Sequence, residues 1–244
     1  MWGAFLWGLL AASSLLIGAG IAALHEPHRR ALGLVMGFGA GVLLSAVSFE
    51  LVEESVNKAA GAGGAGAGFF AGALVFLAGD WAISRLGYRD RKSIAAAAPS
   101  ASGLAILLGI ILDGIPESAV IGLTLLDSGK VGVAMLVAVF ISNVPEAVAA
   151  TASLRGSGWS LSRLFTLWSV TAVVCALASA AGYGLLAHAS GSLLAFVLAF
   201  AGGAILAMLS TTMMPEAFEH AGRAVGLATT FGFALAFGIN WVSG

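Results

Sequence analysis

Two five-residue stretches decide how this sequence is interpreted: Asp113-Gly114-Ile115-Pro116-Glu117 and Ser142-Asn143-Val144-Pro145-Glu146. Each lies inside a long apolar run, and each places a glutamate directly after a proline. Positions four apart share one face of a helix, so Asp113 would lie over Glu117 and Ser142 over Glu146. If the two helices are neighbours, three carboxylates and an amide oxygen can meet away from bulk water. The pattern predicts a cation site within a membrane.

The composition around these stretches is that of a membrane protein. The 244 residues are 59% hydrophobic and 9% charged, whereas a soluble domain carries about a quarter charged residues. So few charges cannot cover a water-facing surface, which favours an integral membrane protein. The formal net charge of -1 gives no reason to expect a nucleic acid partner.

Hydrophobic runs divide the chain into candidate membrane spans. A bilayer is crossed by about 20 apolar residues, and on that measure we expect eight transmembrane helices, at residues 2–24, 32–56, 67–86, 103–126, 131–154, 163–188, 193–218 and 222–243. The predicted fold is all-α, with residues 1–244 forming a single transmembrane domain. Residues 61–68, rich in glycine, and residues 93–102, rich in alanine and serine, are predicted to be connections.

Basic residues orient these spans. Nine of the 11 lysines and arginines fall in the connections after spans 1, 3, 5 and 7, namely Arg29, Arg30, Arg85, Arg89, Arg91, Lys92, Arg155, Arg163 and Arg223. The opposite side carries Lys58 and Lys130. Because cytoplasmic connections are rich in lysine and arginine, we expect both termini to lie outside the cytoplasm.

The acidic residues inside the spans call for an explanation, because a charge in mid-membrane is costly. No lysine or arginine lies mid-span to neutralise Asp113, Glu117 or Glu146, so these groups hold either protons or a cation. Pro116 and Pro145 each remove the helix hydrogen bond to the carbonyl four residues earlier. Carbonyls freed at membrane depth are tolerated where they line a cavity or meet an ion. Proline plus carboxylate therefore predicts a cluster of oxygen ligands.

A related spacing recurs in spans 2 and 7. Glu50-x-x-x-Glu54 and Thr212-x-x-Pro215-Glu216 both place a glutamate four residues after a polar residue, on spans that run in opposite directions. This suggests inverted three-helix repeats, residues 2–86 and 163–243, around a central pair at residues 103–154, a 3+2+3 arrangement typical of many secondary transporters.

Four polar residues on spans 2, 5 and 7 form a possible accessory metal pathway: Glu50, Glu54, Ser142 and Glu216. Glu50 and Glu54 are equally compatible with solvated charges at the interface. Glu216 is equally compatible with a helix end among the lipid headgroups.

Four segments together resemble the ZIP (Zrt/Irt-like) family of divalent-metal transporters: Leu-Leu-Ser-Ala at 43–46, Asp-Gly-Ile-Pro-Glu at 113–117, Asn-Val-Pro-Glu at 143–146 and Met-Met-Pro-Glu-Ala at 213–217. The resemblance implies eight spans with outward termini, and a metal site formed by Asp113, Glu117 and Glu146, with Asn143 contributing to a second. It also implies transport of divalent metal toward the cytoplasm, a homodimer, and the bacterial inner (plasma) membrane. The metal would be the substrate, and no cofactor is expected.

The motifs also depart from that family. Asp113 and Gly114 stand where the family usually has histidine and asparagine, and Ser142 stands where it often has histidine. Zinc favours nitrogen and sulfur ligands, whereas manganese accepts oxygen. An all-oxygen site leaves zinc, manganese, iron, cobalt and cadmium as alternatives.

Two other functions use the same residues differently. The carboxylates could serve a proton- or sodium-coupled carrier of a small solute. An intramembrane hydrolase would need a metal held by histidine, or a serine or cysteine with a base. No histidine lies mid-span and the single cysteine, Cys175, lies in an apolar run, so the chain is not expected to be an enzyme.

Overall fold

The computed structural model describes residues 1–25, 28–59, 62–85 and 103–243. Within these ranges the chain is all-α, with no β-strand. The predicted linker at 93–102 and the basic residues Arg89, Arg91 and Lys92 lie outside the described residues.

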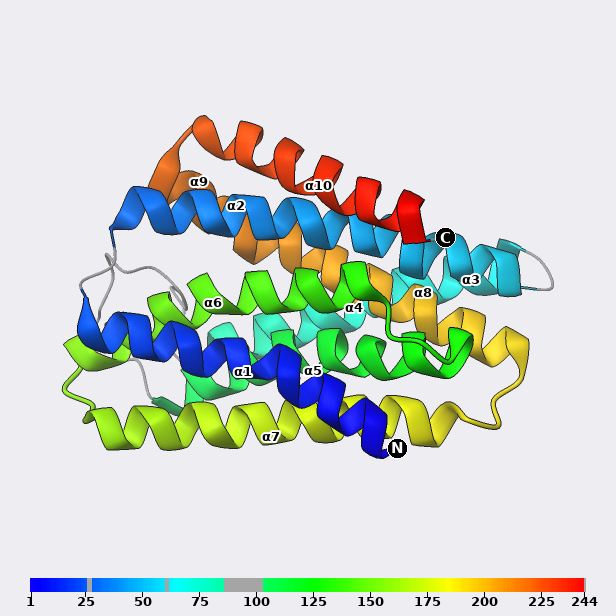
Figure 1. Cartoon of the computed structure of the whole chain (residues 1–244), viewed down its shortest axis with the longest axis horizontal. Helices are drawn as coiled ribbons and strands as arrows, with labels where there is room; N and C mark the ends of the chain where they lie inside the picture. The colour runs from blue at the N-terminus through cyan, green and yellow to red at the C-terminus, as the bar shows by residue number, and fades with distance from the viewer. Residues whose placement is uncertain (26–27, 60–61, 86–102, 244) are drawn as a thin grey trace.

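The helices run along the long axis of the molecule (Figure 1). They are α1 (Trp2–Leu24), α2 (Arg29–Ala46), η1 (Val47–Val52), α3 (Glu53–Lys58), α4 (Ala62–Arg85), α5 (Gly103–Ser128), α6 (Val133–Gly156), α7 (Leu161–Leu186), α8 (Gly191–Met208), η2 (Leu209–Met213), α9 (Met214–Ala221) and α10 (Ala224–Ser243). Both η segments are π-helical. α2, η1 and α3 follow one another without a break, as do α8, η2 and α9.

Seven helical segments of the described residues are long and apolar enough to cross a membrane, including the 30-residue Arg29–Lys58 and the 31-residue Gly191–Ala221. α5 has 26 residues, which exceeds the about 20 needed for a crossing. The predicted all-α, polytopic character of the chain is confirmed at this level. Successive long segments alternate in direction, and the two termini lie at the same end of the bundle (Figure 1).

Polar groups at the segment ends satisfy helix termini. The Ser160 and Ser190 side chains accept hydrogen bonds from the Arg163 N–H at 3.4 Å and the Leu193 N–H at 3.3 Å, which caps α7 and α8. The Arg155 guanidinium donates to the carbonyls of Ala22 and Ala23, both at 3.0 Å, and so closes the C-terminus of α1. Arg155, which is predicted to lie on the cytoplasmic side, thus also holds α6 against the end of α1.

The predicted flexible connection at residues 61–68 is wrong, because α4 already begins at Ala62. Gly63, Gly64 and Gly66 have no neighbour within 4 Å, so the helix at these positions extends from a packed section of α4 that begins at Gly68. Gly68 and Gly72 of α4 lie directly against the carbonyls of Phe196 and Phe200, and Gly203 of α8 lies against the Phe69 carbonyl. Close packing of small residues stabilises helix pairs in membranes and outweighs the poor helix propensity of glycine.

Three glycines of α2, spaced four residues apart at positions 33, 37 and 41, pack against the C-terminal helices. Gly33 faces Ala217, His220 and Ala221 of α9, Gly37 faces Val225 of α10, and Gly41 lies against the Thr229 carbonyl. In return, Gly232 of α10 lies against the Phe38 carbonyl, and the Thr229 hydroxyl donates to the Gly37 carbonyl at 2.9 Å.

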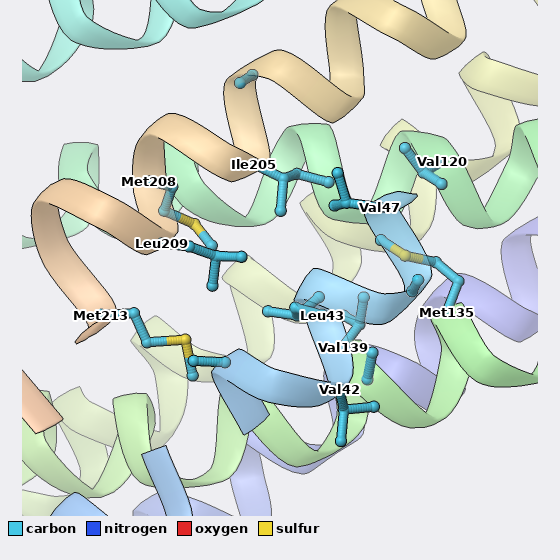
Figure 2. Close-up of a cluster of buried hydrophobic side chains, with 14 of the residues drawn as sticks. Val42, Leu43, Val47, Val120, Met135, Val139, Ile205, Met208, Leu209 and Met213 are labelled. Carbon is cyan, nitrogen blue, oxygen red and sulfur yellow. The ribbon is translucent and has the colours of Figure 1, made fainter. Parts of the chain in front are cut away.

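An apolar core joins α2, α6 and α8. Leu43 and Val47 lie between Ile205 and Leu209 on one side and Met135 and Val139 on the other (Figure 2). The two π-helical segments belong to this core, because Val47 lies in η1 and Leu209 in η2. The core fixes the central helix α6 against the two long segments that contain α2 and α8.

Candidate functional site

The acidic residues of the two central helices are shielded by protein. Asp113 and Glu117 are each 2% exposed and Glu146 is 8% exposed, while Asn143 and Ser142 are also buried. These side chains therefore face the interior of the bundle and not the surrounding lipid. Both motifs lie within continuous helices, with Pro116 inside α5 and Pro145 inside α6.

α7 positions the acidic motif of α5. Gly122 of α5 lies against the Ser179 carbonyl of α7, and Gly182 of α7 lies against the Ala119 carbonyl of α5. This two-way glycine contact brings the backbones close together just beyond Glu117. The buried Ser179 hydroxyl then donates to the Ala4 carbonyl at 2.8 Å, which attaches α1 to the same pair.

α1 and α2 position the motif of α6. Gly18 of α1 lies directly against the Val144 carbonyl, next to Pro145. On the other side, a Cβ added at Gly39 of α2 would lie 3.2 Å from the Ser142 Cα. The Ser142 hydroxyl donates to the Val139 carbonyl of its own helix at 3.1 Å. The backbones of α1 and α2 therefore both pack closely against α6, within one helical turn of Glu146.

The predicted ligands thus lie on two neighbouring helices that both contact α1. Among the residues that the structure describes, no group of three or more histidine, cysteine, aspartate or glutamate side chains is arranged to hold a metal ion. The predicted ligand set Asp113, Glu117, Asn143 and Glu146 stays a prediction.

Cys175 of α7 is a neighbour of the acidic motif that the sequence did not indicate. Its thiol lies 3.9 Å from the Gly114 carbonyl, and Ser118 is a hydrogen-bond partner of the same thiol, with Glu117 close enough to interact electrostatically. The thiol comes from a helix 61 positions further along the chain. No spacing within α7 could have indicated this contact, because all three neighbours belong to α5.

Glu50 and Glu54, the predicted accessory residues at the termini end, have different partners. Glu50 Oε1 accepts a hydrogen bond from the Met135 N–H in the first turn of α6 at 3.3 Å. Glu54 Oε1 lies 3.0 Å from the Lys58 ammonium, one helical turn away. Both glutamates line a cavity of about 820 Å³, together with Thr124, Lys130 and Asn240 among others.

Glu216, the predicted accessory residue at the other end, is buried and pairs with a histidine. Glu216 Oε1 lies 3.8 Å from His220 Nε2, one turn further along α9. The His220 side chain is 2% exposed, and its Cβ lies against Gly33 of α2. A carboxylate and an imidazole on one helical face are both metal-binding groups.

Both π-helical segments were missed by sequence reasoning, which assumed regular α-helices. η1 contains Glu50, and η2 ends directly before Met214, Pro215 and Glu216. π-helical turns occur frequently at functional sites. The Ser210 and Thr211 hydroxyls of η2 both donate to the Ala207 carbonyl, at 3.0 and 2.8 Å.

Compared with known proteins, the chain matches no protein-family model and no curated protein.

Proposed function

We propose that the chain is a ZIP-like divalent-metal transporter that moves its ion toward the cytoplasm. The observation that carries the proposal is the burial of Asp113, Glu117 and Glu146 inside α5 and α6. Ionisable groups at membrane depth are rare, face the protein interior and mark ion pathways. Three of them on adjacent central helices, with Asn143 beside them, offer oxygen ligands suited to a hard or borderline divalent ion.

Ion binding would draw the carboxylates of α5 and α6 together. The smooth glycine contacts that both helices make with their neighbours favour small sliding movements, since no side chain interlocks at those points. Gly18 against α6 and Gly122 against α7 are such contacts. Under this proposal the ligand set is Asp113, Glu117, Asn143 and Glu146, completed by the ion.

The proposed 3+2+3 inverted repeat finds support in how the helices pair. Exchanging α1 with α7, α2 with α8, α4 with α10 and α5 with α6 converts the α4–α8 contact into α10–α2, and α1–α6 into α7–α5. The α4–α8 pair and the α2–α10 pair also both contain glycine-to-carbonyl contacts in each direction. The π-helical segments η1 and η2 directly follow α2 and α8, which are exchanged with each other in this comparison. Inverted repeats around a midplane site are common in secondary transporters.

The proposed ion path and the orientation of the protein in the membrane follow from the positions of the charged residues. The cavity lined by Glu50 and Glu54 would receive the ion at the termini end, and the Glu216–His220 pair would meet it near the other end. By the positive-inside rule the termini end is external, in a bacterial inner membrane. A homodimer is part of the proposal through the family resemblance.

Uptake by purified protein in liposomes tests the function. Glu117→Gln and Glu146→Gln keep side-chain volume and remove the ligand charge, so each should abolish divalent-metal uptake. Glu53→Gln removes a charge at an exposed position and should leave uptake unchanged. Competition among manganese, iron, zinc, cobalt and cadmium would then rank the substrates.

Two results would contradict the proposal. One is normal uptake by both buried-site variants. The other is thermal stabilisation of the wild-type protein by a proton- or sodium-coupled solute, with none by divalent metals.

A further inference from the structure

Glu50 of η1 connects α2 to the first turn of α6. Its Oε1 accepts a hydrogen bond from the Met135 N–H at 3.3 Å, and the neighbouring Ala134 N–H also stabilises the charge of the same carboxylate. The N–H groups in the first turn of a helix have no partner within that helix. α6 begins after Gly132, which supplies no side-chain cap. Glu50 therefore caps α6 from another helix, where a carboxylate also suits the helix dipole.

Gly132 makes room for this cap. A Cβ at that position would collide with Glu50 Oε2, although the Gly132 φ of -62° would suit any residue. Its N–H donates to the Thr124 hydroxyl at 3.0 Å, which holds the turn before α6 in place. Glu50 Oε2 is buried here and makes no hydrogen bond within the described part of the chain. The glycine is thus needed for space and not for its backbone conformation.

The capped turn lies between a cavity and the proposed ligands. Gly132, Val133 and Ala134 line the same cavity of about 820 Å³ as Glu50. Further along α6, Glu146 lies 11 residues after Met135, a rise of about 16 Å at the usual helical pitch. Because a helix moves largely as a unit, holding its first turn also fixes the depth of the carboxylate it carries.

We propose that Glu50 is a positioning residue, which sets the depth of the metal-binding helix α6 by capping its N-terminus. In this conformation the Glu50 carboxylate caps α6 and does not bind an entering cation. The consequence for transport rests on the proposed function, whereas the cap itself does not.

Amide hydrogen exchange on the purified, metal-free protein tests the cap directly. Glu50→Ala should make the amides of the first turn of α6 exchange about five-fold faster, the equivalent of the ~1 kcal/mol typical of a lost helix cap. Gly132→Ala should produce the same change by displacing an intact Glu50. Glu50→Gln retains an acceptor oxygen and should exchange nearly as wild type does. Glu53→Gln and Gly238→Ala are matched controls, because Glu53 is exposed and Gly238 has no neighbour within 4 Å.

Transport by the same variants tests the positioning role. Glu50→Ala and Gly132→Ala should lower the maximal uptake rate with little change in KM, and Glu50→Gln should restore the rate. A glutamine variant as defective as the alanine variant would overturn the proposal in favour of Glu50 as a cation ligand. Unchanged exchange in both Glu50→Ala and Gly132→Ala would also overturn it. A wild-type protein that transports no divalent metal would defeat the proposed function while the exchange result still decided the cap.

Discussion

The thiol of Cys175 lies 3.9 Å from the carbonyl oxygen of Gly114, the residue that directly follows Asp113. Cys175 is 2% exposed, and it is the single cysteine of the chain. A Cβ added at Gly114 would lie 3.1 Å from the sulfur, tighter than an ordinary contact. The close approach of α5 and α7 at the acidic motif therefore depends on a glycine on one helix and a small side chain on the other.

Replacing Gly114 by alanine should destabilise the protein, because the new methyl group presses on the Cys175 sulfur. Overpacking of this kind costs about 1–3 kcal/mol, and the low end is expected since a single contact is involved. Adding Cys175→Ala should restore stability by removing the sulfur. Thermal unfolding in detergent measures both, and a double variant no more stable than Gly114→Ala would show that the two residues do not interact.

Cys175 should also report on metal binding. A small methanethiosulfonate reagent that enters during fluctuations of the helices would modify this buried thiol without any background from other cysteines. If a divalent ion binds beside Glu117, it should slow the modification, because the ion occupies and tightens the space around the thiol. Glu117→Gln should remove this protection. Equal rates with and without metal would place the ion away from α5.

Gly18 and Gly20 of α1 provide a matched pair. A Cβ at Gly18 would collide with the Val144 carbonyl and lie 2.8 Å from the Ala147 Cβ, whereas a Cβ at Gly20 would have no neighbour within 4 Å. Gly18→Ala should therefore separate α1 from α6 beside Pro145 and lower both stability and uptake. Gly20→Ala should be neutral, or stabilising by up to about 1 kcal/mol through helix propensity. Equal behaviour of the two variants in unfolding and uptake measurements would contradict the packing.

Much of the fold could be predicted because hydrophobic runs and prolines are local signals. The span at 2–24 coincides with α1, and Pro116 and Pro145 lie inside helices as expected. Residues 61–68 were assigned wrongly because α4 extends back to Ala62 from a section at Gly68 and Gly72 that packs against α8, a contact between distant parts of the chain. The same limit applies to the candidate site. Its buried acids were recognisable from their apolar surroundings, but the Glu50 cap reaches a residue 85 positions away.

Metal binding should weaken as the pH falls. Protons and divalent ions compete for the same carboxylate oxygens, so acid protonates Asp113, Glu117 and Glu146 and removes the charge that attracts the ion. Binding releases protons, and the dependence of the apparent affinity on pH should be steeper when more carboxylates take part. Asp113→Asn should therefore bind more weakly and with a shallower pH dependence, since one competing site is lost. Glu53→Gln, at an exposed position, should reproduce the wild-type curve. Titration calorimetry in a series that runs from neutral pH down through the range in which carboxylates take up protons measures both quantities, and an affinity that stayed constant through that whole range would exclude ionised carboxylates as the ligands.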